Sequence, residues 1–368
     1  MSQFDASETK IHLISQARPE AAVDVVFIHG LGGHYRTTWE ADKATATFWP
    51  EWIAEDIPEA CVWSAQYPAD PAKWLGGRGD SLPLLTVVFA LLDRFDQAKL
   101  GNRPIILICH SLGGLVAKQL LRAAAERTAA KNWKVIGAAV KGVVFISTPH
   151  TGAPLSNFLA TMATKLFPGV LLRPTESLKD LQANGPMLNQ LSAWYRDAAH
   201  TDGIATLVYY ENKPTAGVVV VPFDSADPTL LKVTPIPLSY DHWQTCKPRD
   251  RTYQAYMGAV GFIREVMSRP EPGALTLEQF REAVGKLPPG QKALLQRISK
   301  RENGVGISDL VAPGQTSKEV WYRGKDLAGT GLIEIRELSE RTLVLSDGVK
   351  KLLRAHPDIV NQTLQQLD

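Results

Sequence analysis

Ser111 stands in the sequence ICHSLGG, between an apolar run typical of a strand (residues 104–110) and a helical pattern (residues 112–127). A tight strand-to-helix turn of this kind is a nucleophile elbow, which exposes a serine hydroxyl at the edge of a sheet. The residues two before and two after the serine must be small, because strand and helix cross closely there. Gly113 meets this requirement, while Cys109 stands where the pattern usually has glycine. A glycine-rich turn with an incidental serine is the alternative, but the flanking strand and helix favour a nucleophile.

A serine nucleophile needs a base that accepts its proton. In proteins with such an elbow the base follows the serine and the acid along the chain. His242 meets this order, because it lies in the loop sequence SYDHW after the apolar runs and before a helical pattern. We predict that His242 is the base. Two other histidines lie near the same elements: the turn directs His110 aside, and we interpret His150 as a packing or substrate-lining residue.

The third member of such a site is a carboxylate that orients the base. Glu211 ends the apolar run of residues 205–211, where proteins with this elbow usually place their acid, and we favour it. Asp224, in the sequence VPFDSA, is the alternative. Asp241 is less suited because it adjoins the base, so its side chain should point away from the imidazole.

A second glycine-rich segment, HGLGG at residues 29–33, directly follows the apolar sequence VDVVFI. Backbone N–H groups in such a loop can stabilise an oxyanion together with the N–H that follows the nucleophile. We predict that the two donors are the N–H groups of Leu31 and Leu112. A phosphate-binding loop is the poorer interpretation, because the segment lacks GKS or GKT and does not fit a dinucleotide motif. The chain also shows no metal-ligand spacing, so we expect neither metal nor cofactor.

The elements that must position these residues form an alternating pattern over the first two thirds of the chain. Runs rich in Val, Ile and Leu alternate with longer helical patterns, which indicates an α/β fold with a mainly parallel sheet buried on both faces. Residues 151–200 break the alternation, and we expect them to form a helical cap over the carboxyl ends of the strands. The expected strands are residues 23–29, 61–67, 104–110, 141–147 and 205–211, and the expected helices are residues 81–100, 112–127 and 250–267.

A boundary falls near residues 268–274, where the sequence SRPEPGA follows a helical pattern. We therefore expect an N-terminal domain over residues 1–270 and a second domain over residues 275–368. In the second, three helical patterns precede a predicted β-hairpin, an order typical of a winged-helix domain. The helices are expected at residues 276–286, 290–300 and 317–330, and the hairpin strands at residues 331–337 and 342–346.

The composition of the 368-residue chain excludes several classes of protein. Apolar residues make up 45%, charged residues 21%, and the formal net charge is only +2, so neither a disordered chain nor a polyanion-binding surface is indicated. Its 3 cysteines are too few for a disulfide framework. The most apolar stretch, residues 82–92, is about half of the roughly 20 residues that a membrane span needs. With no visible secretory signal, we expect a soluble cytoplasmic protein.

These motifs together resemble one branch of a known family. The stretches VFIHGLGGH, CHSLGGLVAKQ, VVFISTPHTGAPL, YYENKPT, VVPFDSAD and DHWQTCKP occur in order between about residues 23 and 268. In this respect the chain resembles the serine-active-site-containing (SERAC-type) branch of the α/β-hydrolases, which is related to lipases and to glycosylphosphatidylinositol inositol-deacylases. The resemblance implies Ser111 as nucleophile, His242 as base and an acid near Glu211 or Asp224. It does not extend to the C-terminal domain.

Two functions are consistent with these residues. The first is a serine esterase or lipase that cleaves carboxylic esters through an acyl-enzyme. Tryptophans gathered between Trp39 and Trp74 could line its apolar acyl pocket, although core packing explains tryptophans more often. The second is a ligand-sensing or regulatory protein whose winged-helix domain binds DNA or a protein. Residues 275–368 carry 14 basic and 12 acidic side chains, which favours a protein partner over nucleic acid.

Overall fold

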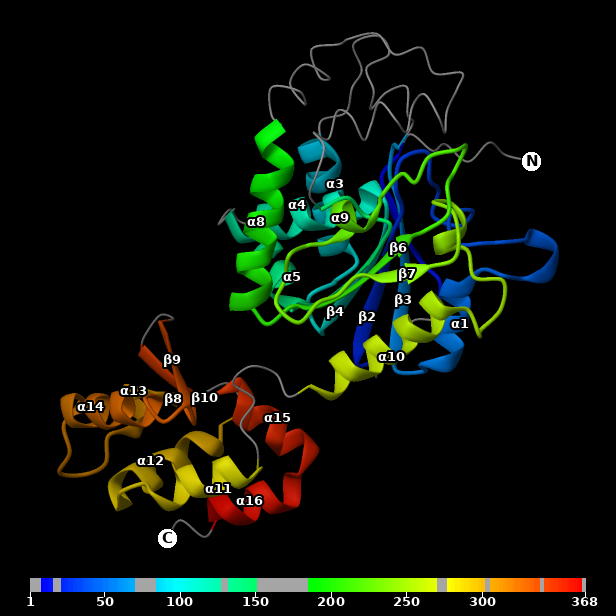
Figure 1. Cartoon of the computed structure of the whole chain (residues 1–368). Coiled ribbons are helices and arrows are strands. Elements are labelled where there is room, and N and C mark those ends of the chain that lie inside the picture. The colour runs from blue at the N-terminus through cyan, green and yellow to red at the C-terminus, as the bar shows by residue number, and fades with distance from the viewer. Residues whose placement is uncertain are drawn as a thin grey trace. The chain divides into compact units, whose positions relative to one another are not determined.

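The chain divides after residue 269 into two units, Met1–Arg269 and Pro270–Asp368 (Figure 1). The structure is a computed structural model, and each unit is described by itself. The described residues are 8–15, 21–69, 84–126, 132–150, 185–269, 277–301, 305–337 and 341–365.

A seven-stranded sheet forms the centre of the N-terminal unit, in the order β1-β3-β2-β4-β5-β6-β7. Only the pairing of β1 with β3 is antiparallel, and every other neighbouring pair is parallel, so the predicted mainly parallel sheet is confirmed. The strands are β1 (Lys10–Leu13), β2 (Val23–Ile28), β3 (Ala60–Gln66), β4 (Ile105–His110), β5 (Val140–Ile146), β6 (Ala205–Glu211) and β7 (Ile236–Leu238).

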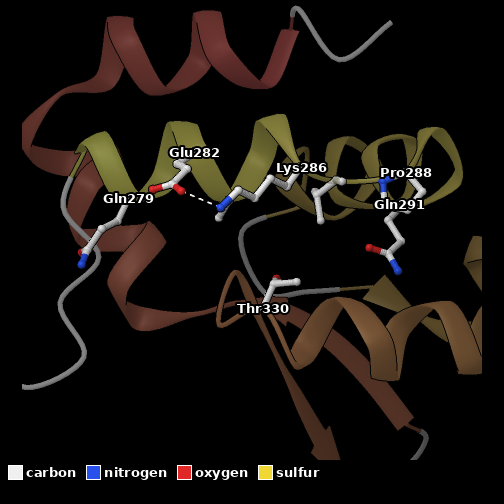
Figure 2. Close-up of a pocket in the computed structure, with 8 residues that line it drawn as sticks. Gln279, Glu282, Lys286, Pro288, Gln291 and Thr330 are labelled. Carbon is white, nitrogen blue, oxygen red and sulfur yellow. Dashed lines mark hydrogen bonds and ion pairs between the residues drawn. The ribbon is translucent and has the colours of Figure 1, made fainter.

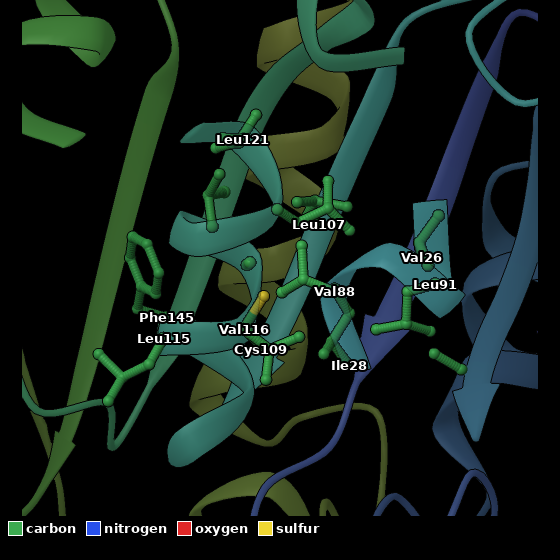
Figure 3. Packing of buried hydrophobic residues seen from close by; sticks show 14 of the residues in the cluster. Val26, Ile28, Val88, Leu91, Leu107, Cys109, Leu115, Val116, Leu121 and Phe145 are labelled. Atoms are coloured by element: carbon green, nitrogen blue, oxygen red, sulfur yellow. The ribbon is translucent and has the colours of Figure 1, made fainter. Parts of the chain in front are cut away.

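Both faces of the sheet are buried, which explains the nearly continuous apolar runs of its strands. Every residue of β2 is buried, and alternate side chains enter different cores. Val26 and Ile28 pack with the helices on one face, whereas Val25 and Phe27 pack with those on the other. Figure 3 shows the first of these cores, where Val26, Ile28 and Leu107 of the strands meet Val88 and Leu91 of the covering helix.

Helices cover the two faces of the sheet in two layers. One layer contains α3 (Leu84–Gln97), α4 (Leu112–Glu126), α5 (Trp133–Ala139) and α8 (Gly185–Thr201). The other contains α1 (Trp49–Asp56) and α10 (Gln254–Ser268). The helical patterns predicted before and after the elbow therefore correspond to α3 and α4, and the last one corresponds to α10. With α4 following β4 directly, the elbow is held between the sheet and its first covering layer (Figure 1).

The last part of the predicted cap, residues 185–200, needs a correction. Residues 151–184 lie outside the described residues, but the remainder of the predicted segment forms α8, which packs along α4. Its residue Tyr195 is buried, and the Tyr195 hydroxyl lies 2.8 Å from Thr206 Oγ1 of β6. Since α8 connects the parallel strands β5 and β6, it is a crossover helix of the sheet rather than part of a cap.

The tryptophans that we considered for an acyl pocket belong to the core in the described part of the chain. Trp39 and Trp49 are completely buried and make edge-to-face contacts with Phe27 of β2. The Trp63 indole donates a hydrogen bond of 2.8 Å to the buried Asp24 carboxylate. Trp74 lies outside the described residues. Packing on the sheet therefore explains these side chains.

The C-terminal unit has its own sheet and core. Its three strands lie in the order β8-β10-β9, and all its pairs are antiparallel. Phe280 and Leu295 are completely buried in a core that contains no residue of the N-terminal unit. The elements are α11 (Leu277–Gly285), α12 (Pro289–Ser299), β8 (Val305–Gly306), α13 (Ile307–Leu310), α14 (Ser317–Ala328), β9 (Ile333–Glu337), β10 (Arg341–Leu345), α15 (Asp347–Ala355) and α16 (Pro357–Gln365).

A cavity of about 400 Å³ lies beside α11 and the start of α12. Figure 2 shows the Glu282 carboxylate at its wall, paired with the Lys286 ammonium at 2.5 Å. All of its lining residues belong to the C-terminal unit, and none is a predicted site residue. They are Gln279, Glu282, Ala283, Lys286, Leu287, Pro288, Gln291 and Thr330.

All three cysteines are free thiols inside the N-terminal unit. Cys61 belongs to β3, Cys109 is the last residue but one of β4, and Cys246 belongs to the short helix η3 (Gln244–Cys246). Each is at most 2% exposed. Burial raises the pKa of the Cys109 thiol well above its ordinary value and raises that of Cys246 to about 12. The Cys109 side chain therefore acts as a small apolar group in the core, where Figure 3 shows it beside Val116.

Candidate active site

The predicted elbow is present between β4 and α4. Ser111 has a φ of 52°, in the left-handed region that non-glycine residues rarely adopt. The surrounding structure holds this conformation, because the Ser111 N–H donates to the Ile146 carbonyl (2.9 Å) and the Ser111 carbonyl accepts from Thr148 Oγ1 (3.0 Å). A Cβ on Gly113 would lie 2.2 Å from the Ile28 carbonyl oxygen. The close approach of the start of α4 to the end of the neighbouring strand β2 therefore requires glycine at this position.

Ser111, His242 and Glu211 form one line of hydrogen bonds. His242 Nε2 lies 2.9 Å from Ser111 Oγ, and His242 Nδ1 lies 3.2 Å from Glu211 Oε1. All three side chains are at most 1% exposed. In this geometry the serine donates to Nε2 while Nδ1–H donates to the carboxylate, which is the tautomer that a general base requires.

Glu211 is held as a carboxylate at the end of β6. Burial raises its pKa, but the positive charge on His242 and the hydrogen bonds from His242, Ser147 and the Val221 N–H lower it by more, so its pKa lies below the ordinary value. The Val221 N–H donates to Glu211 Oε1 at 2.5 Å. The other candidate acid, Asp224, lies on the four-residue helix α9 (Phe223–Ala226) with an exposed side chain. The geometry therefore brings Glu211, rather than Asp224, to the imidazole.

The loop that carries His242 is fixed through its main chain. The His242 N–H donates to Thr215 Oγ1 at 2.9 Å. Next to it, Asp241 Oδ1 accepts hydrogen bonds from the N–H groups of Trp243 (3.0 Å) and Gln244 (2.9 Å). Asp241 therefore caps the turn that follows His242, which agrees with the expectation that it is less suited as the acid.

The glycine-rich loop after β2 lies against the elbow. A Cβ on Gly30 would lie 2.8 Å from the Ser111 Cβ, so only glycine allows this approach. Tyr67 stacks on the buried His29 ring at 4.2 Å, and the Tyr67 hydroxyl donates to the His29 carbonyl, which fixes the start of the loop. Leu112 opens α4, so its N–H is one of the first four in the helix, which have no intrahelical partner.

The sequence does not predict two polar contacts near the elbow, that of the His110 ring with the His242 carbonyl and that of Lys118 with Ser192. His110 Nε2 lies 2.9 Å from the His242 carbonyl oxygen, whereas the sequence indicated only that His110 points aside. His150 is completely buried, packs edge-to-face on Phe145, and has no hydrogen-bond partner for its ring nitrogens within the described part of the chain. The buried ammonium of Lys118 on α4 donates to Ser192 Oγ of α8 at 2.9 Å. Nothing in the motif spacing distinguishes these residues from ordinary core positions.

Neither a metal centre nor a membrane segment is found in the described ranges. No group of three or more His, Cys, Asp or Glu side chains among these residues could hold a metal ion. Likewise, no described helix is long and apolar enough to cross a membrane.

Comparison with known proteins was decisive for the family. A profile described as "Alpha/beta hydrolase family" matches residues 25–288, which include the elbow, the acid position and the base loop. The chain belongs to the alpha/beta hydrolase family. This hydrolase is 28% identical to Protein SERAC1 of Bos taurus over 269 residues, covering 67% of the chain and 39% of that protein. Protein SERAC1 of Homo sapiens matches with the same identity and coverage, so the match spans well under half the length of these relatives.

Solved structures of hydrolases show a weaker likeness. The lipase BlEst2 of Bacillus licheniformis is 17% identical, with a TM-score of 0.42 over 68% of this chain and 97% of that one. YbtT, a type II thioesterase from the yersiniabactin pathway, is 16% identical, with a TM-score of 0.38 over 70% of this chain and 99% of that one. At these values the family assignment rests on the sequence match.

Proposed function

We propose that this hydrolase is a serine esterase that cleaves carboxylic esters through an acyl-enzyme. The observation that carries the proposal is the 2.9 Å contact between His242 Nε2 and Ser111 Oγ, with Glu211 on the opposite ring nitrogen. The strained φ of Ser111 supports it, because such backbone outliers concentrate at functional sites.

In the first half-reaction, His242 takes the proton of Ser111 as the serine oxygen attacks the ester carbonyl. The N–H groups of Leu31 and Leu112 stabilise the resulting oxyanion. The imidazolium then gives its proton to the departing alkoxide, which leaves as an alcohol. In the second half-reaction, water gives a proton to His242 and attacks the acyl-enzyme, and the acid leaves as Ser111 regains its proton.

The proposal is tested with a fluorophosphonate and with short p-nitrophenyl esters. We expect the probe to label Ser111, and Ser111→Ala to abolish both labelling and hydrolysis, since loss of a nucleophile costs several orders of magnitude in rate. Ser192→Ala is the matched control, because Ser192 is another buried serine of the same unit. Labelling or hydrolysis that persists in Ser111→Ala would overturn the mechanism.

A regulatory role for the C-terminal unit is the second candidate. We propose that the order of α11, α12 and α14 followed by the β9–β10 hairpin is a winged-helix arrangement that contacts a protein. Its helix α14 exposes Tyr322 at 54%, which suits a protein interface. The exposed charges of α14 are mixed: the basic side chains Lys318, Arg323 and Lys325 are accompanied by the acidic Glu319 and Asp326.

This second proposal predicts weak binding to DNA. DNA affinity depends on lysine and arginine contacts to phosphates, and acidic side chains on the contacting helix oppose them. A fluorescence-anisotropy titration of the full chain with labelled duplexes, at moderate salt, should show neither tight binding nor sequence preference. Tight, sequence-selective binding would reverse the assignment and favour a DNA-reading role.

A further inference from the structure

The carbonyl oxygen of the proposed base accepts two hydrogen bonds from side chains. His110 Nε2 and Thr245 Oγ1 each lie 2.9 Å from the His242 oxygen. A carbonyl oxygen only accepts, so both groups are donors, and Nε2 is the protonated nitrogen of His110. Together with the bond from its N–H to Thr215, the main chain of His242 is held on both sides.

His110 is placed to align the base with the nucleophile because it is bonded covalently to Ser111. The chain runs from Ser111 to His110, the His110 ring contacts the His242 carbonyl, and the His242 ring returns to Ser111 Oγ. This closed chain of covalent bonds and hydrogen bonds fixes the imidazole relative to the serine through the end of β4. The alignment therefore does not depend only on the longer loop that carries His242. A displacement of about 1 Å in such a pair can cost ~100-fold in rate.

The surroundings of His110 keep it a neutral donor. Its ring is 1% exposed, lies 5.0 Å from the His242 ring between centroids, and makes an edge-to-face contact with the buried Trp39. Burial and the positive charge on His242 hold the pKa of His110 well below its ordinary value. A neutral neighbour can hold the base in place without repelling the charge that His242 acquires.

Thr245 supplies the second donor and connects the base to β5. Its hydroxyl is completely buried and lies 3.2 Å from Ser147 Oγ, in the residue that follows β5. Ser147 in turn donates its N–H to the Tyr209 carbonyl of β6 at 2.8 Å, so it is anchored in the sheet. The two donors therefore reach the same oxygen from different elements: His110 from the end of β4, and Thr245 from η3, which Ser147 links to the end of β5.

We propose that His110 and Thr245 are positioning residues that set the alignment of His242 with Ser111 by donating to the His242 carbonyl. This inference rests on the proposed serine mechanism and adds two residues to it. Neither residue touches the reacting atoms, so their loss affects the chemical step more than substrate binding.

The test uses two pairs of variants in the full chain. His110→Phe and Thr245→Val keep the shape of the side chain and remove the donor. His110→Gln and Thr245→Ser keep a donor at a similar reach. We expect each donor-free variant to lower kcat by about 10–100-fold with KM unchanged. Each donor-keeping variant should restore most of kcat, and thermal melting should show whether all four fold.

The outcomes separate this inference from the proposed function. If wild type shows no Ser111-dependent hydrolysis, the mechanism fails, and the inference fails with it. If wild type is active and folded Thr245→Val keeps the wild-type kcat, only the inference is overturned. A rise in KM equal to the loss of kcat/KM would also overturn it, because it would indicate a substrate contact. Should His110→Phe not fold, Thr245→Val and Thr245→Ser decide the matter.

Discussion

His29, His110 and His150 are completely or almost completely buried, and each lies at or just beyond the carboxyl end of a parallel strand. Burial lowers the pKa of His29 to about 4 and holds those of His110 and His150 well below their ordinary value. A proton is therefore costly on any of these rings. His242 faces the Glu211 carboxylate, which in the proposed mechanism stabilises the imidazolium that forms when Ser111 loses its proton.

At the residue scale, the acid can be identified by comparing two isosteric variants. Glu211→Gln keeps the side-chain shape but removes the charge that faces His242 Nδ1, so we expect kcat to fall by about 10⁴-fold. Asp224→Asn is the control, and its kcat should stay near the wild-type value because Asp224 is exposed on α9. Steady-state hydrolysis of a short p-nitrophenyl ester measures both. The opposite ranking would assign the role to Asp224.

Lys118 is a buried cation that the proposed mechanism does not use. It is completely buried on α4, and its ammonium lies over the rings of Phe145 (5.6 Å) and Tyr195 (5.4 Å). Burial, and to a smaller extent the charge of Arg196, lower its pKa to about 7. Between pH 7 and the ordinary lysine pKa near 10.5, the unfolded chain binds more protons than the folded one. The stability cost of Lys118 is therefore complete below pH 7 and falls as the pH rises through this window.

Lys118→Met should remove that cost. We expect it to raise the free energy of unfolding by about 1–4 kcal/mol at pH 6.5, because an apolar side chain of similar volume replaces a buried charge. The gain should shrink as the pH approaches 9.5. Urea unfolding at several pH values measures it, with the exposed Lys134→Met on α5 as control. A gain that does not depend on pH would show that Lys118 keeps one protonation state throughout.

At the element scale, α10 contains a matched pair of glycines. A Cβ on Gly258 would lie 1.7 Å from the Tyr209 hydroxyl of β6, whereas a Cβ on Gly261 has nothing within 4 Å. Gly261→Ala should stabilise the protein by about 0.5–1 kcal/mol through helix propensity. Gly258→Ala should destabilise it by about 1–3 kcal/mol, because the buried Tyr209 must move. Chemical denaturation measures the free energy of unfolding of both variants. Equal changes would show that α10 does not pack tightly against β6 at Gly258.

In the N-terminal unit, the strands that the sequence predicts are the central ones with nearly continuous apolar runs. The edge strands lack this signal: β1 has four residues with partly exposed side chains, and β7 has three with Pro237 at its centre. Their place depends on pairing with β3 and β6, which local sequence does not encode. The packing of α8 on α4 also depends on tertiary structure. The sequence therefore indicates that this segment is helical but not where the helix lies.

The residues of the candidate site show the same distinction between features that the sequence indicates and contacts that depend on the fold. The elbow at Ser111 and the chain order that leads to His242 are local or sequential features, so the sequence indicates both. The choice between Glu211 and Asp224 depends on which carboxylate faces Nδ1, and the contact of His110 with the His242 carbonyl joins residues 132 positions apart. Such contacts arise from the three-dimensional fold, and no spacing of residues in the sequence predicts them.

At the scale of the whole molecule, the two units have separate cores. Phe280→Ala should destabilise the C-terminal unit by about 3–5 kcal/mol, since it empties a completely buried position. We expect scanning calorimetry to show a lower transition for that unit alone, while the rate at which a fluorophosphonate labels Ser111 stays unchanged. Val25→Ala, in the sheet of the N-terminal unit, is the reciprocal control. A parallel fall in labelling with Phe280→Ala would show that the hydrolase unit depends on its neighbour.

The placement of the thiols gives the molecule an internal reporter. Cys61, Cys109 and Cys246 are the 3 cysteines of the chain, and all are buried in the N-terminal unit. A thiol reagent can therefore react only when that unit opens, and it is blind to opening of the C-terminal unit. Cys109 lies two residues before Ser111, and Cys246 lies four residues after His242. The rate of alkylation at each thiol, measured by mass spectrometry, therefore reports how often the segments that carry the proposed nucleophile and the proposed base open.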